Sequence, residues 1–154
     1  MKKNYLILAV DTSCDETSAS ITVNDKILAN IVSSQVEIHQ KWGGVVPRLA
    51  KREHQKMLDP VINQALKKAK VKLGQIDALA ITIGPGLAPA LEIGITKIKE
   101  LAKKWKKPVI SVNHMEGHLF SSLAKNSKGN GPFTKTRPQF PILGLLVSGG
   151  HTQL

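Results

Sequence analysis

Two histidines placed four residues apart form the part of this sequence best suited to chemistry. His114 and His118 stand in the segment His-Met-Glu-Gly-His, and on a helix their Cβ atoms would lie about 6 Å apart on one face. Two imidazoles in that arrangement suit a shared metal ion, which would need at least one more protein ligand. A chance pair of surface histidines is the alternative. Glu116 would point roughly 200° away from His114 around the helix, which argues against a metalloprotease.

Acidic and hydroxyl-bearing residues follow the first apolar run of the chain. Asp11, Asp15 and Glu16 lie in the segment Asp-Thr-Ser-Cys-Asp-Glu-Thr, where a strand turns back on itself. Backbone N–H groups and hydroxyls in such a turn can hold phosphate, directly or through Mg²⁺. A polar β-turn with local side-chain hydrogen bonds is the alternative, and the segment taken alone favours it.

Two glycine-rich turns end apolar runs later in the chain. Residues 146–152 read Leu-Val-Ser-Gly-Gly-His-Thr, and together with residues 11–17 they suggest a pair of phosphate-binding hairpins. Residues 84–90 would bring backbone and a helix N-terminus toward an anion. They lack the lysine of a P-loop and the spacing of a dinucleotide-binding fingerprint. A plain strand-to-helix connection is therefore the better prediction for residues 84–90.

Hydrophobic periodicity predicts the strands and helices that carry the candidate site residues. We expect strands over residues 5–10, 18–23, 27–32, 78–83, 108–112 and 142–147, and helices over residues 45–70, 93–105 and 114–124. Pro60 either kinks the first helix or begins a second helix that Asp59 caps. The order predicts an α/β fold in which helices flank a mixed sheet. The last strand either joins this sheet or opens a second lobe.

The composition fits one cytoplasmic domain with a strongly basic surface. The 154 residues are 42% hydrophobic and carry a formal net charge of +11, with enough apolar content for one core. No stretch is apolar enough for a membrane span, and Asp11 interrupts the N-terminal apolar run too early for a secretory signal. Cys14 alone cannot form an internal disulfide. The positive charge suggests nucleic acid, with a solvated lysine-rich surface as the alternative, and 4% aromatic residues argue against a base-stacking platform.

Several segments of the chain, in this order, resemble the TsaD/Kae/YgjD (Gcp) family of tRNA threonylcarbamoyladenosine transferase subunits. They are residues 11–17, 33–54, 84–91, 113–118 and 145–154. The resemblance covers nearly the whole chain, and its most specific motifs are Asn-His-Met-Glu-Gly-His and Ser-Gly-Gly-His-Thr-Gln-Leu. It implies an actin/Hsp70/sugar-kinase-like fold, with two lobes and a nucleotide cleft between them.

The resemblance also divides the chain. Residues 1–113 correspond to the first lobe, and residues 114–125 correspond to the metal-ligand helix. Residues 126–141, which carry glycines and prolines without periodicity, are the linker. Residues 142–154 are the opening strand and glycine turn of a second lobe that is mostly absent. Because the family's remaining metal ligand, an aspartate, belongs to that lobe, these residues alone are not expected to form a complete active site.

The activity that the resemblance implies is transfer of a threonylcarbamoyl group from threonylcarbamoyl-AMP to N6 of the adenosine beside the anticodon, in tRNAs that read ANN codons. His114 and His118 match ligands of one divalent metal, iron or zinc, which would hold the threonylcarbamoyl group. Asp11, Asp15 and Glu16 match the acidic loop, where a catalytic role is expected, and Mg²⁺ can accompany the nucleotide. The substrate-binding loop is matched by Leu146, Val147, Ser148, Gly149 and Gly150.

The resemblance implies that tRNA is a partner. Because the last motif has a bacterial form, it also implies TsaB-like and TsaE-like proteins as partners, with a TsaC-type enzyme that supplies the adenylate. Basic side chains are candidates for contacts with tRNA phosphates: Arg48, Lys51, Arg52, Lys97, Lys99, Lys103, Lys104, Lys106 and Lys107. Three alternatives stay open, namely a non-catalytic TsaB-like scaffold, a metalloprotease, and a sugar kinase or ATPase of the same fold. The histidine motif argues against the scaffold, and the position of Glu116 argues against the protease.

Overall fold

The computed structural model of the chain describes residues 4–131, 139–148 and 151–153. Its strands are β1 (Leu6–Asp11), β2 (Glu16–Val23), β3 (Lys26–Ser34), β4 (Ala78–Gly84), β5 (Val109–Asn113), β6 (Leu146–Ser148) and β7 (His151–Gln153). Its helices are α1 (Val36–Gln40), α2 (Pro47–Ala69), α3 (Ala88–Trp105) and α4 (His114–Ser121), with a 3-10 turn, η1, at Leu73–Gln75. The predicted alternation of strands and helices is confirmed.

Strands β1 to β5 form one mixed sheet in the order β3-β2-β1-β4-β5. Strand β1 pairs antiparallel with β2, as expected for a chain that turns back on itself at residues 11–17, and β2 pairs antiparallel with β3, whereas β4 lies parallel to both β1 and β5. The carboxyl ends of β1, β4 and β5 therefore meet at one edge of the sheet. Asp11, Gly84 and Asn113 end these strands, so the acidic loop, the glycine-rich turn and the histidine helix start beside one another.

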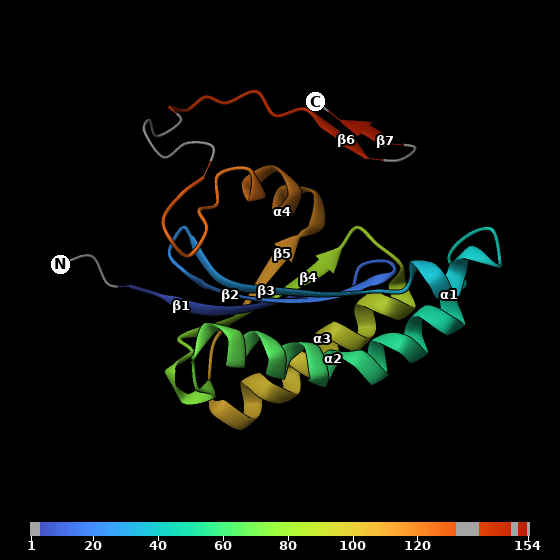
Figure 1. Cartoon of the computed structure of the whole chain (residues 1–154), viewed down its shortest axis with the longest axis horizontal. Coiled ribbons are helices and arrows are strands. Elements are labelled where there is room, and N and C mark those ends of the chain that lie inside the picture. Colours follow the sequence, from blue (N-terminus) through green and yellow to red (C-terminus); the bar gives the residue numbers. More distant parts are fainter. Residues whose placement is uncertain (1–3, 132–138, 149–150, 154) are drawn as a thin grey trace.

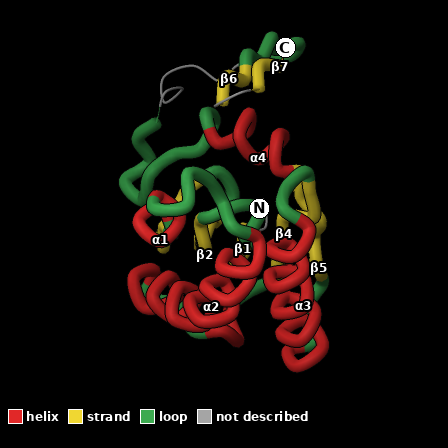
Figure 2. The backbone as a smooth tube through the Cα atoms, turned by 90° about the vertical axis from the view of Figure 1, so that its right-hand side faces the viewer, coloured by secondary structure: helices red, strands yellow, loops and turns green. Residues whose placement is uncertain are grey.

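Helices α2 and α3 lie side by side against one face of the sheet, and α4 lies above the opposite face (Figure 1, Figure 2). Alternate strand residues such as Leu8 and Val10 of β1 and Leu79 of β4 are buried in the core beneath these helices. The hydrophobic periodicity of residues 45–70 forms an apolar stripe on α2, which completes the core with Leu58, Val61, Ile62 and Ala65. Truncating a fully buried leucine to alanine costs about 2–5 kcal/mol, so this layer is a stable frame for the edge above it.

Helix boundaries differ from the predicted ones for local reasons. Helix α3 begins at Ala88 rather than at residue 93, because Pro89 stands in its first turn, where a missing N–H costs nothing. Helix α2 continues through Pro60, so Pro60 does not begin a second helix. Helix α4 ends at Ser121, short of the expected residue 124. Helix α1 escapes prediction because its five residues are too few to show a helical period.

The strand expected over residues 142–147 is shorter than predicted and does not join the five-stranded sheet. Strands β6 and β7 pair antiparallel in a separate two-stranded sheet, which lies on the same side of the molecule as α4 (Figure 1). Residues 142–145 are not part of the strand. The domain boundaries at residues 113, 125 and 141 stay predictions. Across the described residues, no helix is both long and apolar enough to span a membrane.

Candidate functional site

Asp11 and His114 meet at the edge where β1 and β5 end. Oδ2 of Asp11 lies 2.9 Å from Nδ1 of His114 and accepts a second hydrogen bond, also 2.9 Å long, from the Thr82 hydroxyl of β4. Oδ1 of Asp11 accepts a 2.6 Å hydrogen bond from the backbone N–H of Ser13. One carboxylate therefore connects the ends of three neighbouring strands, and it fixes the orientation of the first histidine of α4.

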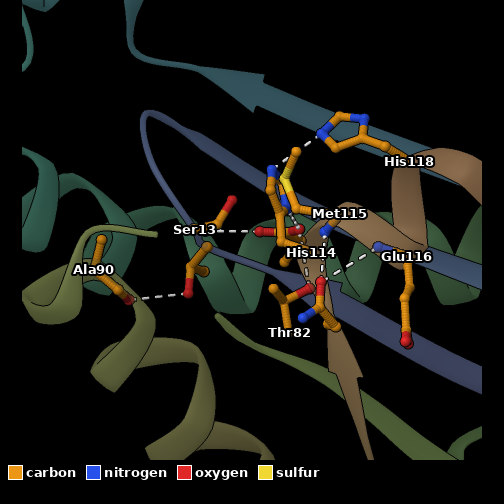
Figure 3. A network of polar contacts seen from close by, with 10 residues as sticks. Ser13, Thr82, Ala90, His114, Met115, Glu116 and His118 are labelled. Carbon is orange, nitrogen blue, oxygen red and sulfur yellow. Dashed lines mark hydrogen bonds and ion pairs between the residues drawn. The ribbon is translucent and has the colours of Figure 1, made fainter. Parts of the chain in front are cut away.

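His118 faces His114 along α4, as the spacing predicts. Because the Asp11 carboxylate accepts, His114 donates its Nδ1 proton and keeps a free lone pair on Nε2. Nε2 of His118 lies 3.0 Å from this nitrogen, and the two rings meet edge to face (Figure 3). Either the two nitrogens share a proton, or both bind one metal ion. No group of three metal-ligating side chains exists within the described residues, so these residues supply two ligands at most.

The start of α4 is fixed by its cap. The side-chain oxygen of Asn113 accepts hydrogen bonds of 2.9 Å and 3.3 Å from the backbone N–H groups of Met115 and Glu116, which are otherwise unpaired at a helix N-terminus. The Glu116 side chain points away from both histidines (Figure 3). The geometric argument against a metalloprotease base is thus confirmed.

The glycine-rich turn after β4 contacts the acidic loop. The backbone N–H of Leu87 donates a 2.6 Å hydrogen bond to the carbonyl of Ser13, and the Thr12 hydroxyl donates to the carbonyl of Ala90 over 2.9 Å. A Cβ atom on Gly86 would lie 2.6 Å from that Ser13 carbonyl oxygen. The turn is therefore a strand-to-helix connection, as predicted, and its glycine allows close approach to the loop.

His54 of α2 is hydrogen-bonded to the same loop. The sequence analysis did not identify this residue. Its Nε2 donates a 3.0 Å hydrogen bond to the carbonyl of Cys14, and its Nδ1 accepts one of 2.8 Å from the Thr17 hydroxyl. Burial lowers the pKa of this imidazole, so it is held neutral. The signal was its position four residues before Leu58 on the apolar stripe of α2, where a histidine needs polar partners.

The acidic loop contains two carboxyl groups whose pKa values are shifted in opposite directions. Burial opposes ionisation of Asp11, but hydrogen bonds from Ser13, His114 and Thr82 outweigh it and hold the pKa of Asp11 below its ordinary value. Partial burial, together with the charges of Asp15 and Asp11, raises the pKa of Glu16. Burial and the neighbouring Asp15 raise the pKa of the Cys14 thiol to about 11. The fold therefore favours the ionised form of Asp11 and disfavours that of Glu16.

The other predicted site residues lie at varying distances from the histidines. Among the described residues, Asp15 and Glu16 make no direct hydrogen bond to either histidine, although His114 affects the pKa of Glu16 electrostatically. Leu146 lines a cavity of about 370 Å³ together with His118, Leu119 and Phe120. Val147 is largely exposed, and Ser148 ends β6. Gly149 and Gly150 lie outside the described residues.

The candidate tRNA contacts separate into two groups. Lys51 pairs with Glu92 over 3.0 Å, Arg52 with Glu53 over 3.8 Å, and Lys97 with Asp59. These cations are partly neutralised by their partners, and the exposed Arg48 lies near Lys51 and Arg52 in the first turn of α2. In contrast, Lys103 and Lys104 lie in the last turn of α3, and none of the ion pairs found in the described residues includes them.

Comparison with known proteins identifies relatives of the chain. The family model described as TsaD, tRNA N6-adenosine threonylcarbamoyltransferase, matches residues 26–154. Proteins of that name from Anaeromyxobacter sp. (strain Fw109-5) and Thermomicrobium roseum are 48% and 46% identical over 96% and 97% of this chain. The chain spans 42% and 40% of the length of these two relatives.

A solved structure has a similar fold. YeaZ from Pseudomonas aeruginosa superposes with a TM-score of 0.56 at 28% identity, over 71% of this chain and 44% of that one. The predicted actin/Hsp70/sugar-kinase-like lobe, with a mixed sheet flanked by helices, is confirmed. Sequence, fold and the histidine helix therefore agree, and the chain belongs to the TsaD family.

Proposed function

We propose that this chain forms the N-terminal lobe of an enzyme that transfers the threonylcarbamoyl group from threonylcarbamoyl-AMP to N6 of the adenosine beside the anticodon in tRNAs that read ANN codons. The observation that carries the proposal is the constellation of Asp11, His114 and His118, in a chain that belongs to the TsaD family. Since the chain spans 42% of a full-length relative, the complete reaction belongs to the longer protein.

The histidine pair fits one divalent metal ion, iron or zinc. His114 and His118 would bind it through the two Nε2 atoms that already face each other at 3.0 Å. Asp11 on Nδ1 of His114 is the carboxylate partner that metal-binding histidines commonly have, since it fixes the tautomer and makes the imidazole more basic. A third ligand is required for a mononuclear site and is proposed to come from the second lobe.

The chain's own residues prepare this centre. A bound metal would supply Lewis-acid polarisation of the carbamoyl carbonyl. Asp11 keeps the Nδ1 proton on His114, and Thr82 and Ser13 keep Asp11 ionised. Asp15 and Glu16 add negative potential beside it, where a cation such as Mg²⁺ with a nucleotide would be attracted.

The substrate side of the centre is proposed to involve Leu146 to Gly150. The supporting observation is the apolar cavity that Leu146 shares with His118 on α4. A cavity of about 370 Å³ falls within the size range of small-molecule sites. It would take part of the threonylcarbamoyl-AMP beside the metal.

The partners proposed are tRNA and proteins of the TsaB and TsaE types, acting in the cytoplasm. The likeness to YeaZ, a TsaB-type protein, supports a partner that shares this lobe. TsaE and the cellular location rest on the family resemblance.

The test measures metal content and threonylcarbamoyl transfer together, in the chain and in a longer form that includes the second lobe. Replacing His114 by alanine should abolish both in the longer form. Asp11→Asn should weaken metal binding by about 10–100-fold, because the carboxylate partner is lost. Glu116→Gln, whose side chain points away from the histidines, is the matched control and should keep both properties. Full transfer without bound metal would refute the proposal, and failure to bind metal at all would favour a scaffold role.

A further inference from the structure

Lysines gather at the end of the molecule where both long helices finish. Nine lysines lie in residues 67–72 and 99–107, and we call this surface the basic end. Its members are Lys67, Lys68, Lys70, Lys72, Lys99, Lys103, Lys104, Lys106 and Lys107. Only Glu100 and the adjacent Asp77 are acidic there, so the surface carries a formal charge of +7 out of +11 for the whole chain.

The fold makes these lysines one surface, although up to 40 residues separate them in the chain. Helices α2 and α3 finish at the same end of the molecule (Figure 1). Nζ of Lys107 lies 3.3 Å from the carbonyl oxygen of Gly74 in η1, and this hydrogen bond connects the segments that follow the two helices. Leu73, Ala102 and Trp105 pack against the common core from both sides of this junction.

The positive charge of the basic end is not balanced by the rest of the described chain. None of its lysines takes part in an ion pair among the described residues, unlike Lys51 of α2 and Lys97 of α3. The nearby carboxylate of Asp77 accepts a 2.9 Å hydrogen bond from the backbone N–H of Leu6. Helix dipoles contribute only about half a negative charge at each C-terminus, which cannot offset nine ammonium groups.

We propose that the basic end docks the phosphate backbone of an RNA, which under the proposed function is the tRNA substrate, so the inference rests on that function. Trp105 packs against the core, and the surface offers no other aromatic side chain for base stacking. Phosphate contacts, without base recognition, are what such a surface can provide.

The position of the basic end relative to the histidine site favours a long ligand. The site lies where β1, β4 and β5 end, whereas the basic end surrounds the loops that precede β4 and β5. Strand β1 has six residues, so the two regions are about 20 Å apart along the sheet. A nucleotide cannot reach both, whereas an RNA stem can extend from one to the other. Binding at the basic end would then help to deliver a base to the site.

The experiment compares two variants with the same loss of charge. The test variant combines Lys68→Gln, Lys72→Gln and Lys104→Gln at the basic end. The control variant combines Lys26→Gln, Lys41→Gln and Lys56→Gln, which are exposed lysines elsewhere on the surface. Fluorescence anisotropy at several salt concentrations measures binding to three probes: an unmodified tRNA with an ANN-reading anticodon, an unrelated RNA duplex of about 20 base pairs, and anionic lipid vesicles. Circular dichroism checks that both variants are folded.

The expected result is specific to the test variant. Its affinity for both RNAs should fall about tenfold at 0.1 M salt, and the slope of log K against log salt should decrease by about 2–3. The control should stay within about twofold of the parent chain. Equal losses in both variants, or binding to vesicles and not to RNA, would overturn the docking surface. RNA binding lost only in the test variant, with no threonylcarbamoyl transfer by the longer protein, would support the surface and refute the proposed function.

Discussion

At the scale of single residues, the Asp11 carboxylate connects several elements of the fold. It is the last residue of β1, yet its carboxylate contacts residues of the acidic loop, β4 and α4. Hydrogen bonding to the ionised form lowers the pKa of Asp11 despite partial burial. An ionised Asp11 leaves the Nε2 lone pair of His114 available for a ligand. The histidine pair is thus prepared by a residue about 100 positions earlier in the chain.

Cys14 provides a residue-scale prediction, because it is the chain's single cysteine. Burial, the Asp15 hydrogen bond and the charges of Asp15 and Glu16 raise the pKa of its thiol to about 11, from an ordinary value of 9.0. At neutral pH the thiolate fraction should be about 100-fold lower than in a peptide. Since a more basic thiolate is a better nucleophile, alkylation by iodoacetamide should be about tenfold slower than for a cysteine peptide.

The control for Cys14 is the same chain in denaturant, where the rate should match that of the peptide. Asp15→Asn in the folded chain removes one of the neighbouring charges that raise the pKa, so it should accelerate alkylation. Folded and denatured chains reacting at equal rates would contradict the electrostatic picture of the acidic loop.

The sequence predicted some of these residues and not others for physical reasons. His114 and His118 could be predicted because a helical period places them on one face, and the structure puts their Nε2 atoms 3.0 Å apart. The Asp11 to His114 contact could not be predicted, because it depends on the parallel order of β1, β4 and β5. Thr82 stands within an apolar strand and His54 within a run of charged and polar residues, and only their hydrogen-bond partners in the fold show what they do.

At the scale of elements, α3 and the turn before it are fitted closely to the acidic loop. A Cβ atom on Gly94, inside α3, would lie 2.5 Å from the Thr12 hydroxyl oxygen and 2.9 Å from Ile81 Cδ1. Thr12 is fully buried and its hydroxyl is bonded to Ala90, so it cannot move aside cheaply. Glycine in the helix interior, normally unfavourable by about 0.5–1 kcal/mol, is here required for packing.

Gly94→Ala should therefore destabilise the protein in spite of its higher helix propensity. Overpacking in a core costs about 1–3 kcal/mol, and because Thr12 is buried and hydrogen-bonded we expect this cost to outweigh the propensity gain of about 1 kcal/mol. Urea unfolding should show a net loss of up to about 2 kcal/mol. Gly117→Ala in α4 is the matched control, because its nearest neighbour would be 3.9 Å away. Its stability should be unchanged or higher, and a Gly94→Ala chain as stable as this control would show that Thr12 can move.

The boundaries of helices and strands were predictable where hydrophobic periodicity or a characteristic residue marks them. The strands of the two hairpins and the stripe of α2 follow from alternation and helical period. The early start of α3 was missed because residues 88–91 are all apolar and show no helical period, and only Pro89 in the first turn marks it. The short β6 depends on pairing with β7, which no periodicity reveals in three residues.

At the scale of the whole molecule, the basic end and the histidine site lie at opposite edges of one sheet. The ionised Asp11 and the histidines lie at the carboxyl edge, and the basic end surrounds the opposite one. Sequence alone gave the total charge but not this separation, because Lys67 to Lys72 and Lys99 to Lys107 meet only when α2 and α3 pack together. An extended anionic ligand is the kind of partner that such a separation fits.

At this scale, the two sheets found in the described part of the chain should differ in stability, because β6 and β7 form a hairpin separate from the core. A two-stranded hairpin is marginal by itself in water, and the side chain of Val147 is 69% exposed. Hydrogen exchange followed by NMR should show amides of β6 and β7 opening at free energies near zero, whereas Leu8 and Leu79, both fully buried, should exchange only through global unfolding. If β6 amides proved as protected as those of β4, the hairpin would have to be part of the core. If they exchange freely, the cavity between α4 and Leu146 needs further contacts to become a rigid substrate site.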